Sequence, residues 1–327
     1  MNPYISRVYH QYYDAFERLR EFPPVKDLGA EAQFTNALLR QTQLLSDVIP
    51  TIAQGFHECK KYMDEKDTTE FLNDLITARI GMRVIGEQHV ELSHQYREAL
   101  RDPGAERGEG EVETARRQDT LSDWVGSINI SLEPAKMIKQ ICMYAQNICE
   151  LHYGTAPEFI IDGVVDTSMT YIPSHLEYII MEIVKNAFRA TIEYSTKTRR
   201  LIHPPVRITV SKGVKYVGIR VRDEGGGIPK ADMPHVFDYS WTSMKEKAAG
   251  GTDAAGDSSS VFSIQANLDM QSGTGGPIAG LGFGLPMAKL YCQYFGGSLE
   301  IASMEGLGCD VFIKLPCLEL NLNRTII

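Results

Sequence analysis

The stretch IIMEIVKNAFRA at residues 179–190 decides the fold of the second half of this chain. Glu182 and Asn186 lie four positions apart within it, so a helix places both side chains on one face, where they can act on a single ligand. Lys185 and Arg189 share that polar face and can hold the glutamate or screen phosphate charge. The opposite face is an apolar stripe predicted to lie in the core: Leu176, Ile179, Ile180, Ile183, Val184, Ala187 and Phe188. Ser174 and Glu177 stand at the spacing of a capping box, which predicts the start of the helix there.

Two glycine-rich motifs follow this helix. In the first, DEGGG at residues 223–227, Asp223 ends a predicted strand, where its carboxylate can accept a hydrogen bond from an adenine amino group. Gly225 and Gly227 let the backbone turn tightly and approach the base. In the second motif, GLGFGLP at residues 280–286, free backbone amides near a helix start can meet phosphate oxygens. That motif supplies six candidate contacts: Gly280, Leu281, Gly282, Phe283, Gly284 and Leu285.

Taken alone, each motif has a plainer explanation as an exposed helix face, a surface turn or a linker. In this order, the three motifs resemble the ATP site shared by histidine kinases, type II topoisomerases, Hsp90 and MutL. Asn186 is then expected to offer its amide oxygen to Mg²⁺, which keeps several waters and takes few protein ligands. Glu182 is expected near the γ-phosphate, where it can accept a proton from an attacking hydroxyl or water. Residues 245–280 are predicted to form a mobile lid.

Composition is that of a globular protein of two domains, with 327 residues, of which 43% are hydrophobic and 23% are charged. Lys and Arg number 33 against 42 Asp and Glu, and the net charge of −9 argues against nucleic-acid binding through phosphates. No apolar run reaches the roughly 18 residues of a membrane-spanning helix. The six cysteines lack the spacing of a zinc site, so we expect reduced thiols.

The predicted architecture is α+β. Long amphipathic helices are expected at residues 3–22, 34–66 with a kink at Pro50, 68–100 and 133–151, giving a helical bundle domain of the four-helix type at residues 1–155. Alternating apolar residues at 206–210 and 217–221, and a hairpin at 298–315, indicate strands. Residues 156–327 are therefore predicted to be an α/β-sandwich domain that binds ATP.

The chain also resembles a more specific family, the mitochondrial kinases of pyruvate dehydrogenase and of the branched-chain 2-oxo acid dehydrogenase. The resemblance covers nearly the whole chain. It is carried by the helix motif already quoted and by four further phrases: FERLREFP at 16–23, RIGMR at 79–83, LHYG at 151–154 and SMEG at 303–306.

This resemblance implies transfer of the ATP γ-phosphate to serine on the E1 α-subunit of a dehydrogenase complex, which inactivates it. It also implies docking to the E2 lipoyl domain, a homodimer, and a place in the mitochondrial matrix. Pyruvate dehydrogenase is the first choice of substrate and the branched-chain enzyme a close second. Thr242 and Ser243 become further nucleotide contacts by resemblance. A potassium ion held by carbonyls is similarly implied near Val236, Asp238, Trp241 and Gly282.

Three departures from the family pattern carry expectations of their own. The family usually has threonine where Cys309 stands, so we expect one water-mediated link to adenine to be lost. The only tryptophans are Trp124 and Trp241, so the Asp-Trp tail motif of the animal enzymes is absent. The chain starts where the family already has a helical segment, so we expect part of the bundle and a transit peptide to be missing. His89 lacks the acidic residue that follows a histidine-kinase phospho-acceptor, which favours a structural or effector-linked role.

Two other functions stay open on the sequence. One is an ATPase of the Hsp90 or MutL kind, in which Glu182 activates water. The other is a nucleotide-binding regulator with weakened catalysis, which Cys309 and the shortened start suggest.

Overall fold

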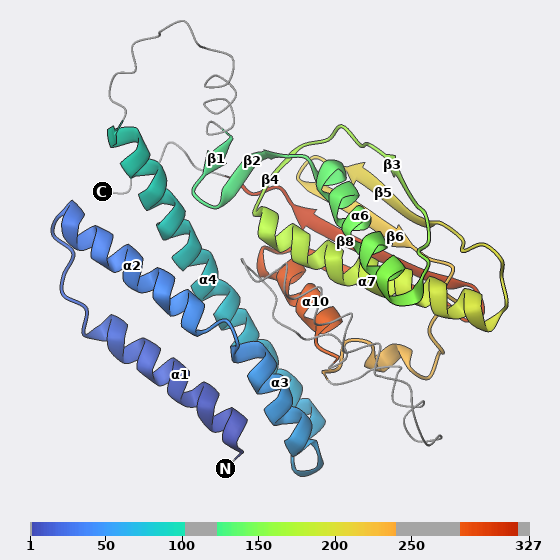
Figure 1. The fold of residues 1–327 in the computed structure, drawn as a ribbon, viewed down its shortest axis with the longest axis horizontal. Helices are drawn as coiled ribbons and strands as arrows, with labels where there is room; N and C mark the ends of the chain where they lie inside the picture. The colour runs from blue at the N-terminus through green and yellow to red at the C-terminus, as the bar shows by residue number, and fades with distance from the viewer. Residues whose placement is uncertain (1, 102–122, 240–281, 320–327) are drawn as a thin grey trace, which may run out of the picture. The chain divides into compact units, whose positions relative to one another are not determined.

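The computed structural model describes residues 2–101, 123–239 and 282–319 (Figure 1). The chain divides into two compact units, Met1–Ser131 and Leu132–Ile327. The predicted boundary near residue 155 differs from this division. The reason is that the helix before it, Pro134–Tyr153, packs with its buried face against a helix of the second unit.

The first unit is built from helices. These are α1 (Pro3–Arg20), α2 (Leu28–Leu44), α3 (Val48–Cys59), the short 3-10 helix η1 (Lys60–Tyr62) and α4 (Glu65–Arg101). Helix α1 packs on α3, and α2 packs on α4. The Asn2 side chain accepts from the Tyr4 amide at 2.9 Å, and the Asp27 side chain accepts from the Ala30 amide at 2.7 Å, so side-chain caps define the starts of α1 and α2.

The helices expected at 3–22 and 68–100 are confirmed, but the single kinked helix expected at 34–66 is wrong. The chain leaves the helix after Leu44 and starts α3 at Val48. Pro50 therefore lies in the first turn of a new helix, where its missing N–H breaks no intrahelical hydrogen bond. A hairpin of β1 (Trp124–Val125) and β2 (Ile128–Leu132) follows α4, and Gln88 and Gln95 of α4 hydrogen-bond its turn.

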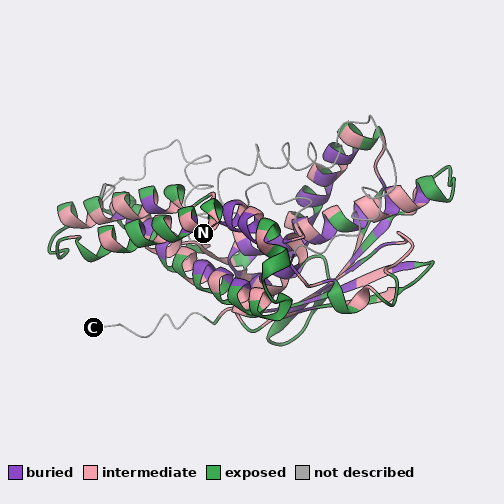
Figure 2. Cartoon of the chain, turned by 90° about the horizontal axis from the view of Figure 1, so that it is seen from below, coloured by how far each residue is buried: buried purple, intermediate pink, exposed green. Residues whose placement is uncertain are grey.

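The second unit is a five-stranded sheet covered on one face by helices (Figures 1 and 2). The strand order is β3-β5-β6-β8-β7; β3 is parallel to β5 and the other neighbours are antiparallel. This arrangement confirms the predicted α+β class. The elements are α6 (Pro134–Tyr153), β3 (Phe159–Gly163), β4 (Met169–Tyr171), α7 (Pro173–Lys197), β5 (Val206–Lys212), β6 (Tyr216–Arg222), η2 (Met233–His235), α10 (Gly284–Tyr294), β7 (Ser298–Met304) and β8 (Gly308–Pro316).

Helix α7 is the central helix of this unit. All seven residues of its predicted apolar stripe are buried, and each Leu, Ile, Val or Phe side chain among them contributes about 1.5–3 kcal/mol when removed from water. The predicted capping box is wrong, because the N-cap lies two residues before Ser174. Ile172 is the N-cap without a side-chain hydrogen bond, and Pro173 occupies the first helical position, where its fixed φ favours the helix.

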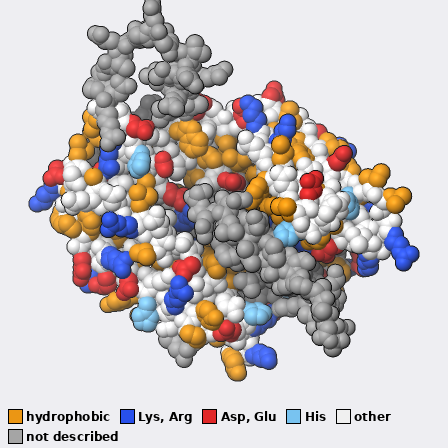
Figure 3. All heavy atoms as spheres, viewed as in Figure 1, with side chains coloured by type: hydrophobic (Ala, Val, Ile, Leu, Met, Phe, Trp, Pro, Cys, Tyr) orange, Lys and Arg blue, Asp and Glu red, His pale blue; other side chains and the backbone are white. Residues whose placement is uncertain are grey.

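On the face shown in Figure 3, acidic, basic and hydrophobic side chains are interspersed. Within the described ranges, no helix combines the length and the apolar character needed to cross a bilayer.

A polar network joins α2 to α4 in the first unit. Glu31 accepts from Arg97 at 2.6 Å and from Thr35 at 2.7 Å, and Thr35 contacts His89 Nε2 at 3.1 Å. Burial acts to raise the pKa of Glu31, but hydrogen bonds from Arg97, Thr35 and Ser93 outweigh it and lower the pKa to about 2. His89 therefore belongs to a network that joins two helices, in keeping with a structural role.

This lowered pKa makes a pH-dependent contribution to stability. Because the folded pKa lies below the ordinary value of 4.5, the contribution is present above pH 4.5 and is lost as the pH falls towards 2. We expect Glu31→Gln to lower the free energy of unfolding by at most about 3 kcal/mol at pH 7 and by much less at pH 3. Chemical denaturation at both pH values measures the difference. Glu17→Gln, which removes the exposed pair with Arg20, is the control and should change it by about 1 kcal/mol or less.

Candidate functional site

The polar face of α7 carries Glu182 against the second glycine motif. Lys185 Nζ lies 2.6 Å from Glu182 Oε1, and both side chains are largely shielded, at 12% and 17% exposed. The other carboxylate oxygen faces the backbone of Gly284, so closely that a Cβ there would overlap Glu182 Oε2. A side chain at position 284 would displace the flexible Glu182 carboxylate, so glycine there permits this contact between the α7 motif and the second glycine motif.

The first glycine motif lies further along the same helix. A Cβ at Gly225 would overlap Ala190 of α7, and a Cβ at Gly226 would overlap the ring of Tyr194. Gly226 and Gly227 have φ values of 85° and 71°, in the left-handed region that favours glycine. Asn186 lies between the two contact points on α7 and is exposed, and its side chain makes no hydrogen bond among the described residues. All three motifs thus meet along one side of α7.

Asp223 follows the last residue of β6 and is only 7% exposed. Its Oδ1 accepts from the amides of Gly225 at 2.8 Å and Cys309 at 3.3 Å. Burial raises the pKa of Asp223 from its ordinary 3.8 to about 6, although these two N–H groups act in the opposite direction. Both of these hydrogen bonds go to Oδ1, so Oδ2 is the oxygen that can face a base.

The turn of the β7–β8 hairpin is hydrogen-bonded to the loop of the first glycine motif, Gly225–Gly227, which we call the glycine loop. The Gly226 amide donates to Leu307 O at 3.1 Å, and the Gly306 amide donates to Gly226 O at 2.8 Å. The Ile228 amide donates to Ser303 Oγ at 2.7 Å, and the Cys309 thiol donates to the same oxygen at 3.4 Å.

Helix α7 is also hydrogen-bonded to this hairpin turn, because the Tyr194 hydroxyl donates to Gly306 O at 3.0 Å. We predicted no site role for Tyr194, Ser303 or Gly306 from the sequence. The glycines at 306 and 308 were the available signal, since they flank a tight turn.

The second glycine motif opens α10. Phe283 is the N-cap, its ring is fully buried, and it contacts the Tyr239 ring at 4.9 Å. It can therefore meet a ligand only through its backbone. Gly282 has φ 73°, and among the described residues no side-chain hydrogen bond caps the start of α10, so the amides at Gly284 and Leu285 suit an anion.

The other predicted site residues are placed as follows. Arg189 Nε donates to Glu193 at 2.9 Å, not to Glu182. Val236 is buried, and Asp238 Oδ2 lies 2.7 Å from His235 Nδ1. Residues outside the described ranges are Trp241, Thr242, Ser243, Gly280, Leu281 and the lid at 245–280. Within the described ranges, no group of three or more His, Cys, Asp or Glu side chains could hold a metal ion.

Comparison with known proteins identifies the class and then the family. Residues 171–319 match the family model of histidine kinase-, DNA gyrase B- and HSP90-like ATPases, so the second unit is an ATPase domain of that class. Residues 1–129 match the model described as mitochondrial branched-chain alpha-ketoacid dehydrogenase kinase.

Relatives extend the likeness over nearly the whole chain. The mitochondrial [pyruvate dehydrogenase (acetyl-transferring)] kinase of Arabidopsis thaliana is 32% identical, with 96% of this chain and 76% of the relative covered. Isozyme 1 of Homo sapiens is 28% identical, covering 98% and 67%, and the Schizosaccharomyces pombe kinase is 33% identical, covering 82% and 55%. The chain therefore belongs to the mitochondrial 2-oxo acid dehydrogenase kinase family, a family of protein kinases that use ATP.

The raised pKa of Asp223 predicts that its ionised carboxylate, which is suited to a ligand, destabilises the folded protein when no ligand is bound. A folded pKa above the ordinary value gives stability that is present below pH 3.8 and is lost as the pH rises through 6. We therefore compare the free energies of unfolding of Asp223→Asn and wild type in nucleotide-free protein. We expect the difference in favour of the variant to be larger at pH 8 than at pH 4, by up to about 3 kcal/mol. Denaturant titrations at the two pH values measure this gain. The exposed Asp166→Asn controls for loss of one charge, and a gain of the same size in both variants would contradict the assignment.

Proposed function

We propose that this chain transfers the γ-phosphate of ATP to a serine of the E1 α-subunit of a mitochondrial 2-oxo acid dehydrogenase complex and thereby inactivates it. The observation that carries the proposal is the meeting of Glu182, Lys185 and Gly284 at the start of α10. It brings a carboxylate and a cation next to free helix amides, which suit the terminal phosphates of a nucleotide.

The roles follow from these positions. Glu182 accepts the proton of the serine hydroxyl as that oxygen bonds to the γ-phosphorus, and the bond from phosphorus to the ADP oxygen breaks. Lys185 holds the glutamate in place. Asp223 takes the adenine amino group, and the loop at Gly225–Gly227 receives the base. Arg189, paired with Glu193, screens phosphate charge from the edge of the site.

Asn186 fits a magnesium role because its carboxamide is exposed and lies one turn after Glu182. Bound Mg²⁺ would neutralise phosphate charge during transfer. For potassium, the Tyr239–Phe283 ring contact at 4.9 Å brings the segment of Val236 and Asp238 next to Gly282, which supports a carbonyl site there together with Trp241.

Pyruvate dehydrogenase is the preferred substrate, because the relatives named above are pyruvate dehydrogenase kinases. The match of residues 1–129 to a branched-chain kinase model keeps the branched-chain enzyme as the alternative. Three further parts of the proposal rest on the family resemblance. They are docking on an E2 lipoyl domain, assembly as a homodimer and a place in the mitochondrial matrix. Phosphorylation of pyruvate and branched-chain E1 side by side tests the substrate choice.

Removal of the proposed base should abolish transfer without abolishing binding. We expect Glu182→Gln to lower ³²P transfer from ATP to E1 by about 10²–10⁴-fold, because proton acceptance is lost, while fluorescent-nucleotide binding stays within threefold. Glu177→Gln, another carboxylate of α7 that pairs with none of the proposed site residues in the described ranges, is the control and should keep most activity. Release of phosphate without labelled acceptor would instead favour an ATPase of the Hsp90 or MutL kind. Tight ATP binding by wild type with no transfer, even with E2 present, would favour a regulator.

The proposed metal ligand makes a separate prediction. Asn186→Ala should reduce transfer at least tenfold at low Mg²⁺ and recover part of it as Mg²⁺ is raised, because one oxygen ligand is lost. Asn186→Asp keeps an oxygen at the position and should need no extra Mg²⁺. Initial rates across a Mg²⁺ titration give the answer, and an equal loss in both variants at every concentration would rule out the role.

A further inference from the structure

The last turn of α7 carries a side chain that contacts two loops at once. The ring of Tyr194 lies against Gly226 of the glycine loop, so closely that a Cβ there would overlap it. The Tyr194 hydroxyl donates to Gly306 O, in the turn of the β7–β8 hairpin, at 3.0 Å. Tyr194 therefore fixes the glycine loop and the hairpin turn to the same helix.

The same two segments hold the carboxylate of Asp223. Its Oδ1 accepts from the amide of Gly225, in the glycine loop, at 2.8 Å and from the amide of Cys309, at the start of β8, at 3.3 Å. Because Oδ1 depends on one amide from each segment, the direction of Oδ2 depends on how the two segments lie against each other.

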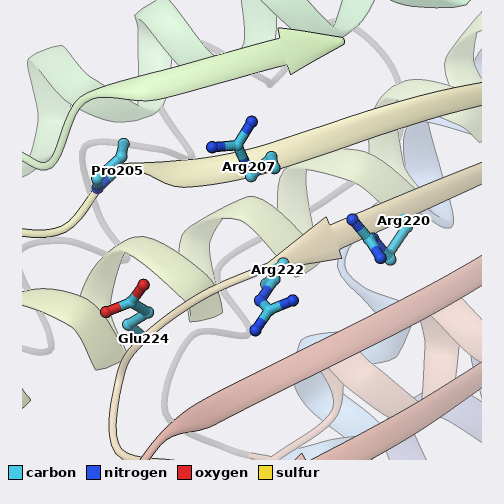
Figure 4. Close-up of a pocket in the computed structure, with 5 residues that line it drawn as sticks. All are labelled: Pro205, Arg207, Arg220, Arg222 and Glu224. Carbon is cyan, nitrogen blue, oxygen red and sulfur yellow. The ribbon is translucent and has the colours of Figure 1, made fainter. Parts of the chain in front are cut away.

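Arg200 joins the same residues from the other side of the Tyr194 ring contact. Its guanidinium carbon lies 5.5 Å from the centre of the Tyr194 ring, within the range of a cation–π interaction. Its Nη1 lies 3.7 Å from Oε2 of Glu224, the residue that leads into the glycine loop. Glu224 also lines a cavity of about 280 Å³ (Figure 4), together with Pro205, Arg207, Arg220 and Arg222. Arg200 therefore connects the start of the glycine loop to the end of α7.

The backbone after α7 is fixed in the turn that carries Arg200. The Arg200 amide donates to Ser195 O at 2.9 Å, and the Arg199 amide donates to Thr196 O at 3.2 Å. Arg199 has φ 54°, in the left-handed region, which costs conformational energy in a residue other than glycine. The two hydrogen bonds hold the turn against this local cost.

We propose that Tyr194 and Arg200 are positioning residues for the adenine base, which set the affinity for ATP and the preference for a base with an amino group. Glycines supply no side chains to hold their own loop, and a loop that must become ordered on binding weakens the affinity. A loop already held by α7 avoids that loss and keeps Oδ2 of Asp223 directed at the amino group. This role rests on the proposed contact between Asp223 and adenine, and neither residue takes part in phosphate transfer.

Equilibrium binding of ATP and of inosine triphosphate (ITP) to the full chain tests the proposal, by displacement of a fluorescent nucleotide. ITP carries a carbonyl oxygen where ATP has the amino group, so wild type should bind ATP more tightly. Tyr194→Phe keeps the ring and loses only the hydroxyl. We expect it to weaken ATP binding by about threefold to tenfold and ITP binding by about twofold or less. Arg200→Ala should act in the same direction by a smaller factor, because its ion pair is partly exposed.

Two variants are matched controls. Arg199→Gly removes the neighbouring arginine, and glycine accepts the φ of this position, so the turn is kept while a charge is lost. Tyr62→Phe removes the hydroxyl of a tyrosine in the first unit that is 88% exposed. Both should leave the ratio of ATP affinity to ITP affinity unchanged, and thermal unfolding checks that every variant is folded.

The outcomes separate this role from the proposed function. An unchanged ratio in Tyr194→Phe, with a clear preference for ATP in wild type, would overturn the role of both residues, and in Arg200→Ala alone that of Arg200. Equal weakening of both nucleotides would also overturn it, because a general loosening of the domain acts on both alike. A wild type that binds the two nucleotides equally would instead remove the contact between Asp223 and adenine, and the role with it. Absence of transfer to E1 with the preference intact would count against the kinase reaction and leave this role standing.

Discussion

The site depends on close approach of backbone to helix α7 at two places. Gly225 meets the backbone of Ala190 with no room for a Cβ, and Gly284 meets the Glu182 carboxylate, which a Cβ would displace. A side chain at Gly225 would push its loop away from the helix, and one at Gly284 would displace the carboxylate of Glu182. These contacts therefore set where the start of α10 and the carboxylate of Asp223 lie relative to Glu182. The buried stripe of α7 holds the helix itself against the sheet.

The same site carries a cost in stability. Asp223 is buried at the end of β6 with two backbone donors, and its burial raises the pKa to about 6. A carboxylate that is unfavourable in the empty protein suits a residue whose partner is a ligand. The hairpin turn around Ser303 and Gly306, hydrogen-bonded to the glycine loop and to Tyr194, keeps this arrangement in place without ligand.

Strand β6 has two chemical faces near its end. Arg220 and Arg222 point to the uncovered side, while Val221 and Asp223 point to the side of α7. Consecutive residues 222 and 223 therefore lie in different surroundings, Arg222 on the helix-free side of the sheet and Asp223 on the side of α7.

The sequence by itself determined the α+β class, most element positions and the set of motif residues, because helix and strand periodicity and glycine-rich turns are local properties. It misplaced the break before Pro50 and the first turn of α7, since a proline in a first turn can begin a helix as well as bend one. Only the tertiary structure decided that Glu182 faces Gly284, that Ser303 and Tyr194 hold the loop at Gly225–Gly227, and that three arginines from two strands share one cavity. These are contacts between residues far apart in the chain or set by strand register, and no local pattern encodes them.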